Sequence, residues 1–362
     1  MKSLRLILSN PRYFAPAWVF ASLNFWFGTW AIYIPTVKQQ LGIDKAKLGI
    51  ALFFLSLGIF TIFPMAARIV NRLGVGRATW YGVLGCSVCA FFPLVAPNYY
   101  ALMAALFFFG AMNGLTDIAM NTLVTEIEKE DDQKFMSAAH GFFSLGGVLA
   151  GLGSFLIAII GSPPLHMLGV ILLVFLVNLR FRKYYMGITA APVEKEAFSL
   201  KLFRPLFLLG LVSFIVMGGE GAIVDWSGLY LKEVSLAPEY LIGGGFLAFS
   251  TTMTLGRFLG DGISTRLGSL RIVALGSLVA ILGYALLLHF RWIPKLRNPF
   301  VHAAGSVVAI SSIVMTYFGV NYFLTGLHSY ASGDAAEVPS WVHIGTAIMV
   351  ALIGAGWAAW RQ

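Results

Sequence analysis

The sequence predicts an all-α, polytopic membrane protein of about eleven transmembrane helices, arranged as a six-helix bundle followed by an incomplete second bundle. Three observations support this fold class. Hydrophobic residues make up 58% of the chain and charged residues only 11%, with a mean hydropathy of +0.81, whereas about a quarter of the residues of a soluble protein are charged. Apolar runs close to the roughly 20 residues that span a bilayer recur along the chain. Basic residues gather in short segments between these runs.

The apolar runs give the predicted spans in order. Residues 1–180 form the N-terminal six-helix bundle, with spans at Trp18–Ile34, Leu48–Ala67, Thr79–Val95, Tyr100–Val124, Phe142–Ile160 and Leu165–Leu179. Residues 181–204 are the longest polar segment and are predicted to be a cytoplasmic linker. Residues 205–288 hold three helices of the second bundle, at Leu206–Leu231, Tyr240–Phe258 and Leu270–Leu288. Residues 289–362 form a tail with two more, at Ala303–Leu324 and Trp341–Trp357.

The charged loops predict the orientation. Basic residues follow the second, sixth and eighth spans: Arg68, Arg72 and Arg77, then Arg180, Arg182 and Lys183, then Arg257, Arg266 and Arg271. Because cytoplasmic loops carry the excess of Lys and Arg, this pattern predicts a cytoplasmic N-terminus. The expected location is the bacterial inner (plasma) membrane. The net charge of +9 arises in these loops, so we expect a lipid bilayer as the partner and no nucleic acid.

An internal repeat relates the two halves. Leu48–Arg77 aligns without gaps to Ile242–Arg271, at an offset of 194 residues, and both segments end in the same Arg-Leu-Gly-x-x-Arg turn. Two related bundles of this kind are typical of secondary transporters, whose substrate site lies at the interface of the repeats near the bilayer midplane.

Polar residues within the predicted spans are candidates for substrate binding. Asn113, Asp117 and Asn121 are spaced by four residues and therefore share one helix face. Asn24 and Trp30 in the first span and Glu220 in the seventh complete the predicted substrate site. An ionisable group in a spanning helix usually faces a cavity or a partner. Asp117 and Glu220 therefore serve either the cavity and proton coupling, or the hydrogen bonding that holds the bundle together.

His140 and Asp225 are further candidates for coupling or gating, and the role of each is ambiguous. His140 begins the fifth span, where a solvated or gate-bonding histidine is as consistent with the sequence as a proton relay. Asp225 lies five residues beyond Glu220, so the two carboxylates face apart. The pair Cys86 and Cys89 lies within an apolar run and is read as two small apolar helix residues rather than a metal or redox motif.

Four segments carry a resemblance to a known family. Asn113-Gly-Leu-Thr-Asp-Ile-Ala-Met-Asn121 with His140-Gly-Phe-Phe-Ser-Leu-Gly-Gly147 resembles helices 4 and 5 of the bacterial sugar-permease and drug-efflux branch of the major facilitator superfamily. Glu220-Gly-Ala-Ile-Val-Asp-Trp-Ser227 and the segment from Gly256 to Gly268 are similar to helices 7 and 8. The resemblance covers residues 1 to about 285.

The resemblance implies roles for particular residues and a function. Arg257, Asp261 and Arg266 match the family's cytoplasmic gating motif, and the first-half copy from Arg68 to Gly74 lacks the aspartate. The implied function is secondary active transport of a small polar or amphipathic organic solute, sugar-like or drug-like, by alternating access and with proton coupling. The protein is therefore expected not to be an enzyme and to bind no cofactor.

The tail suggests an alternative. Thr316 to Tyr330 resembles the end of the CcsA/CcsB-type cytochrome c synthase family, and Tyr284 to Arg291 resembles its preceding helix. That family uses two such histidines as haem ligands, which makes His289 and His328 weak haem-ligand candidates. The loop charges of the tail and of the preceding helices also predict opposite orientations. These observations favour a fusion near Tyr284–His289, with haem handling in cytochrome c assembly, or an inactive fusion product, as alternatives to transport.

Overall fold

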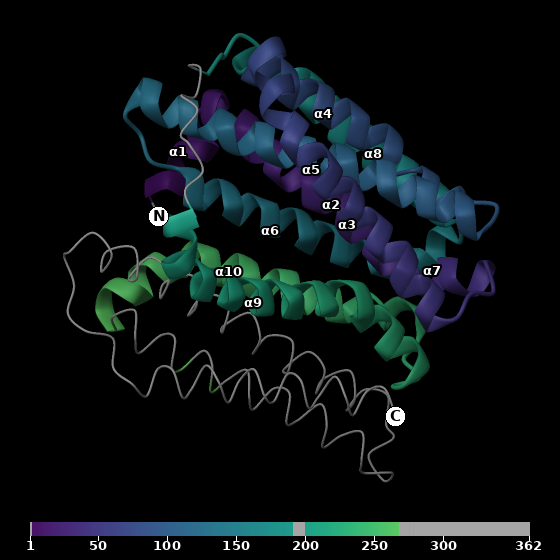
Figure 1. Ribbon diagram of the computed structural model, residues 1–362. Coiled ribbons are helices and arrows are strands. Elements are labelled where there is room, and N and C mark those ends of the chain that lie inside the picture. Colours follow the sequence, from purple (N-terminus) through teal and green to yellow (C-terminus); the bar gives the residue numbers. More distant parts are fainter. Residues whose placement is uncertain (1, 191–199, 268–274, 276–277, 279–362) are drawn as a thin grey trace. The chain divides into compact units, whose positions relative to one another are not determined.

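The structure is a computed structural model that describes residues 2–190 and 200–267 together with Leu275 and Leu278 (Figure 1). The side chains of residues 200–216 and 260–267 lie outside this description, although their backbone is helical. The chain divides into two compact units, Met1–Glu194 and Lys195–Gln362. The division falls within the segment 181–204 that the sequence predicts to be a linker; the predicted domain limits remain predictions.

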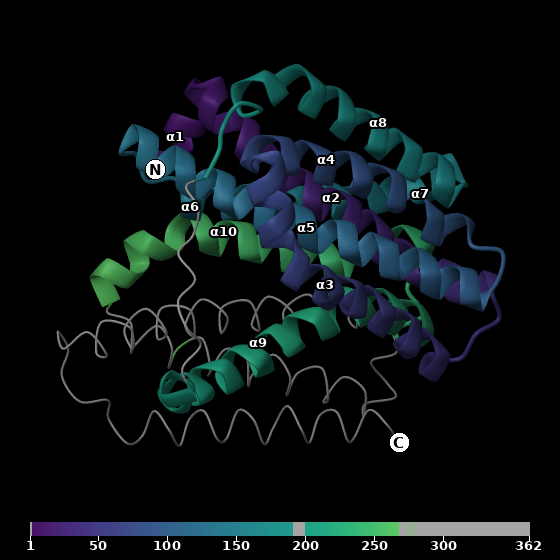
Figure 2. The ribbon, with the colours of Figure 1, turned by 45° about the horizontal axis from the view of Figure 1, so that its top comes forward.

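The first unit is a bundle of long helices with short turns (Figures 1 and 2). Its α-helices are α1 (Lys2–Ser9), α2 (Pro11–Gln40), α3 (Lys45–Leu73), α4 (Val75–Cys89), α5 (Tyr99–Asp131), α6 (Met136–Leu152), α7 (Ile157–Ile160) and α8 (Pro163–Phe181). Three short 3₁₀ helices join or extend them, η1 (Phe92–Val95), η2 (Gly153–Leu156) and η3 (Arg182–Tyr184). Helix α2 packs mainly against α6, and α5 packs against α3 and α4.

The described part of the second unit contains α9 (Leu200–Glu233), η4 (Glu239–Leu241) and α10 (Gly244–Leu267), and α9 packs against α10. The all-helical, polytopic fold class predicted from the sequence is confirmed. One predicted boundary is wrong: Tyr240 lies in η4, and α10 begins only at Gly244, after a turn at Ile242 and Gly243. Glycine lowers the tendency of the backbone to continue as a helix through this turn. The predicted spans Leu270–Leu288, Ala303–Leu324 and Trp341–Trp357 lie outside the described residues, apart from Leu275 and Leu278.

Side-chain caps fix where the helices of the first unit begin. The Asn10 side chain accepts a hydrogen bond from the Arg12 amide at 3.0 Å, and Pro11 occupies the first position of α2. Asp44 caps α3 through the Lys47 amide, and Asn98 caps α5 through the Ala101 amide. Such caps satisfy amide groups that the helix itself leaves unpaired. They therefore set the register in which each long apolar run enters the bundle.

Glycines allow the helices of the first unit to touch through their backbones. A Cβ atom placed on Gly146 of α6 would lie 1.9 Å from the carbonyl oxygen of Ala21 on α2. At the contact of α3 with α5 the arrangement is reciprocal, since a Cβ on Gly58 or on Gly110 would lie 2.0 Å from a carbonyl oxygen of the opposite helix. In a membrane, no hydrophobic force drives helices together, and their association depends on close van der Waals packing instead. Small residues at the contacts allow this close packing.

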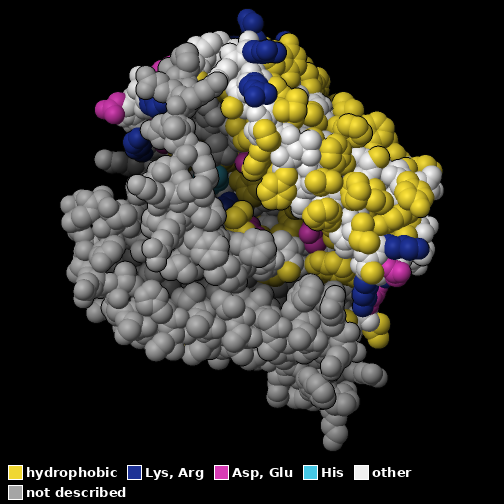
Figure 3. Space-filling model, viewed as in Figure 1, with side chains coloured by type: hydrophobic (Ala, Val, Ile, Leu, Met, Phe, Trp, Pro, Cys, Tyr) yellow, Lys and Arg dark blue, Asp and Glu magenta, His cyan; other side chains and the backbone are white. Residues whose placement is uncertain are grey.

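The outer surface of this unit is apolar. Five helical segments among the described residues are long and apolar enough to cross a bilayer: Lys45–Leu73, Val75–Val95, Tyr99–Asp131, Met136–Leu156 and Pro163–Tyr184. Many large apolar side chains on them are exposed, including Leu172 and Leu176 on α8. Figure 3 shows these side chains as a broad yellow surface with basic side chains at its edges. A water-soluble protein rarely exposes so continuous an apolar surface, so acyl chains are its natural solvent.

Candidate functional site

Three polar side chains line one face of α5, and we call Asn113, Asp117 and Asn121 the α5 polar stripe. All three are half-buried, and the Asn121 amide donates to the Asp117 carbonyl oxygen at 2.9 Å and to its carboxylate Oδ1 at 3.2 Å. Phe108, which is 59% exposed, lies nine residues before Asp117 and therefore on the opposite side of the helix. The stripe thus points away from the apolar outer side of α5.

The first-span candidates lie deeper in the bundle than the stripe. Asn24 is buried, and its amide donates to the Phe143 carbonyl oxygen of α6 at 3.0 Å, so it links α2 to α6. Trp30 is fully buried, and among the described residues its indole Nε1 has no hydrogen-bond partner. A buried donor without an acceptor costs about 1–3 kcal/mol. Trp18 and Trp26, also on α2, share this feature.

His140 also lies on α6, within the same unit. It is half-buried, and its ring packs edge-on against Phe20 of α2 with the ring centroids 4.9 Å apart. The structure thus places the histidine at the contact of α2 with α6.

In the second unit, Glu220 and Asp225 are both half-buried on α9. Arg257 of α10 interacts electrostatically with Glu220 of α9. Two of the predicted gating residues are therefore neighbours on adjacent helices. Asp261 and Arg266 fall in the final turns of α10, where side chains are outside the described residues. His289 and His328 are also outside them. Among the described residues, no group of three or more His, Cys, Asp or Glu side chains has the arrangement of a metal site.

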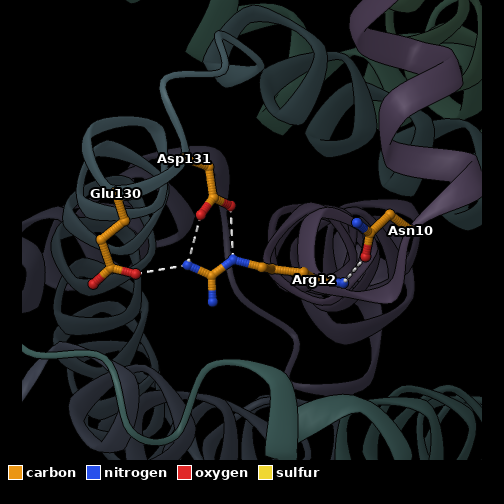
Figure 4. A network of polar contacts seen from close by, with 4 residues as sticks. All are labelled: Asn10, Arg12, Glu130 and Asp131. Carbon is orange, nitrogen blue, oxygen red and sulfur yellow. Dashed lines mark hydrogen bonds and ion pairs between the residues drawn. The ribbon is translucent and has the colours of Figure 1, made fainter.

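An ion-pair network that the sequence analysis did not single out lies at one end of the bundle. The Arg12 guanidinium at the start of α2 donates to both carboxylate oxygens of Asp131, at 2.7 and 3.1 Å, and to Glu130 at 2.6 Å (Figure 4). These hydrogen bonds from Arg12 hold the pKa of Asp131 below its usual range, and they raise the pKa of Arg12. The network joins the beginning of α2 to the end of α5. The signal in the sequence was an arginine just before the first span and an acidic run after the fourth.

A second unpredicted contact joins α2 to α8. The Tyr33 hydroxyl lies 2.9 Å from His166 Nδ1, and both side chains are buried. A Cβ on Gly153 would lie 2.8 Å from the His166 ring, so the imidazole fills the space that this glycine leaves. Each of the three residues is unremarkable in the sequence, and only the fold brings them together.

Long apolar helices in close backbone contact, with a carboxylate and amides along an inward face, define the class of polytopic membrane proteins that move small solutes. The chain belongs to the Major Facilitator Superfamily, whose sequence profile matches residues 17–359. It is therefore a secondary transporter of a small-molecule substrate and not an enzyme.

Two sequence relatives agree with this assignment. The chain is 30% identical over 277 residues to an uncharacterized transporter of Sinorhizobium fredii, covering 76% of this chain and 73% of the relative. It is 28% identical over 314 residues to an uncharacterized MFS-type transporter of Yersinia pestis, covering 86% and 77%. Among solved structures, it resembles the nucleoside transporter NupG with a TM-score of 0.58 over 98% of this chain and all 100% of that one. At 15% identity, this last likeness shows the fold alone.

The family match also bears on the tail. It runs across Tyr284–His289 and on to residue 359, so it includes the segment 289–362 that the sequence analysis set apart. The resemblance of that segment to the cytochrome c synthase family is not supported, and neither is haem binding by His289 and His328.

Proposed function

We propose that this transporter couples the movement of a small polar or amphipathic organic solute, sugar-like or drug-like, to the movement of protons by alternating access. Its expected setting is a bacterial inner membrane, with the N-terminus in the cytoplasm, as the basic residues of the loops indicate. Within the first unit, the solute would be held by the α5 polar stripe and Trp30. Glu220 of the second unit remains a substrate-binding candidate from the sequence alone.

The observation that carries the proton-coupling proposal is the environment of Asp117. Its carboxylate accepts a hydrogen bond from Asn121 of its own helix, and among the described residues no basic side chain pairs with it. A carboxylate within a spanning helix is costly to keep charged without a partner. Because the described residues supply no cation, we propose that a proton from solution neutralises Asp117, and that its release returns the charge.

Glu220 differs from Asp117 in this respect. Arg257 supplies it with a positive charge from the neighbouring helix. We therefore assign the proton to Asp117 and a gating or substrate-contacting role to the Glu220–Arg257 pair. The stripe and the Trp30 indole provide both donors and acceptors, which suits a solute bearing hydroxyl or amide groups.

The test is a reconstitution. Proteoliposomes that enclose the pH indicator pyranine are given a panel of sugars and amphipathic drugs, and a solute that changes the internal pH identifies a coupled substrate. Asp117→Asn should abolish this proton movement, while Asp132→Asn, the same change at an exposed position beyond the end of α5, should leave it unchanged. Equal proton movement in wild type and Asp117→Asn would overturn the coupling assignment.

A further inference from the structure

Six basic side chains gather where α3, α4 and α8 end or begin in the first unit. They are Arg68, Arg72, Arg77, Arg180, Arg182 and Lys183, and all are exposed except Arg182, which is half-buried. Within the described part of the chain, no acidic side chain forms an ion pair with any of them. Among the described residues, the positive charge at this end of the bundle is therefore not neutralised by carboxylates.

Backbone contacts join the two segments that carry Arg77 and Arg182. The Gly76 amide, one residue before Arg77, donates to the Ile188 carbonyl oxygen at 3.0 Å. A Cβ on Gly76 would lie 1.8 Å from the Tyr185 carbonyl oxygen, so only glycine permits this approach. The segment that follows α8 is in this way fixed against the start of α4. Arg182 and Arg77 consequently belong to one rigid site and not to two independent loops.

A tryptophan ring packs against one of these arginines. The Arg182 guanidinium lies over the ring of Trp80, with Cζ 5.0 Å from the ring centroid, and Trp80 is almost fully buried against Phe175 of α8. Trp80 is three residues from Arg77 and so lies one turn along α4. Stacking on an indole orients a guanidinium and leaves its N–H groups free to donate to a phosphate.

The apolar surface of the bundle begins directly beside these charges. On α8, Leu172, Leu173 and Leu176 are each about half-exposed, and Leu179 adjoins Arg180. On α4, Tyr81 is 52% exposed next to Trp80. Figure 3 shows basic side chains gathered at the upper edge of the yellow surface. A ligand that fits must carry a negative charge and long apolar chains at the same time.

From this combination we infer that Arg77, Arg182 and Trp80 form a binding site for the headgroup of an anionic phospholipid, with the acyl chains lying along α4 and α8. The phosphate accepts hydrogen bonds from the two guanidinium groups. Basic sites between spanning helices at the cytoplasmic membrane surface bind anionic headgroups in this manner. The inference does not depend on the transported solute or on proton coupling.

The experiment compares lipids on the purified, delipidated full chain. Phosphatidylglycerol and phosphatidylcholine are titrated in neutral detergent, with binding followed by native mass spectrometry. We expect preferential binding of phosphatidylglycerol. At about 1 kcal/mol per basic residue, Arg77→Gln with Arg182→Gln should weaken that binding roughly 30-fold. The charge-matched control, Lys45→Gln with Lys47→Gln at the opposite end of α3, should not change it.

Three results would overturn the inference. These are equal binding of the two lipids, an equal loss of binding in the control, and displacement of phosphatidylglycerol by millimolar inorganic phosphate, which would indicate a simple anion site. If the double variant does not remain monodisperse, Arg77→Gln alone, at an exposed position, should still weaken binding about 5-fold.

Discussion

The contact between α2 and α6 gives the sharpest prediction for the fold. In Gly146→Ala the new methyl group would lie 1.9 Å from the Ala21 carbonyl oxygen and 2.7 Å from its carbonyl carbon. Real Cβ atoms essentially never approach a heavy atom closer than 3.0 Å, so the two backbones must separate by about 1 Å. The Asn24–Phe143 hydrogen bond crosses the same contact three residues away and would lengthen with it.

The expected cost follows from overpacking. Forcing one extra methyl group into a packed contact costs about 1–3 kcal/mol, and here the clash is with backbone, which cannot rotate away. Thermal unfolding in detergent, followed by the loss of the monodisperse peak in size-exclusion chromatography, should show a lower midpoint for Gly146→Ala. Because such unfolding is often irreversible, all variants must be heated at one rate.

The matched control is Gly169→Ala on α8. This glycine is also within a helix, but a Cβ added to it meets nothing within 4 Å. Since alanine favours helix over glycine, the control should unfold at the wild-type midpoint or above it. If Gly146→Ala and Gly169→Ala unfold at the same temperature, the close backbone contact of α2 with α6 does not exist as described.

Two further predictions concern the polar contacts that the sequence did not reveal. Arg12 lowers the pKa of Asp131, so the stability from this pair is present above the usual aspartate value of about 3.9 and is lost as the pH falls through the lower, folded-state value. Because both side chains are partly exposed, Asp131→Asn should cost only about 1 kcal/mol at pH 7. The melting midpoints of variant and wild type should converge as the pH falls below the folded-state pKa of Asp131, and a difference that does not change with pH would contradict this origin. Tyr33→Phe leaves the buried His166 Nδ1 without its partner and should cost about 1–3 kcal/mol, measured as a lower melting midpoint at pH 7; an unchanged midpoint would mean that the hydrogen bond is absent.

The sequence was sufficient for the fold class because its main signals are local. The apolar run Leu165–Leu179 predicts α8, and the charged residues beside it predict where that helix ends. The boundary at η4 was missed because Tyr240 and Leu241 continue the apolar composition, while the break is a turn at Ile242 and Gly243, where glycine lowers helix propensity.

The candidate site was only partly accessible to the same reasoning. The four-residue spacing of the α5 polar stripe predicts a shared face, and the structure describes these side chains together on one side of α5. The contacts of Arg12 with Asp131 and of Tyr33 with His166 join residues 119 and 133 positions apart. No periodicity connects such residues, because their meeting depends on how separate helices pack.

The most direct test of the transport account is the water accessibility of the α5 polar stripe. In a background with Cys86→Ser and Cys89→Ser, single cysteines at positions 113, 121 and 108 are exposed in membranes to N-ethylmaleimide, which reacts with the thiolate and therefore requires water at the thiol. The account predicts rapid labelling of Asn113→Cys and Asn121→Cys and slow labelling of Phe108→Cys on the lipid-facing side. Slow labelling at both stripe positions, equal to that at position 108, would show that the stripe lines no pathway and would contradict the account.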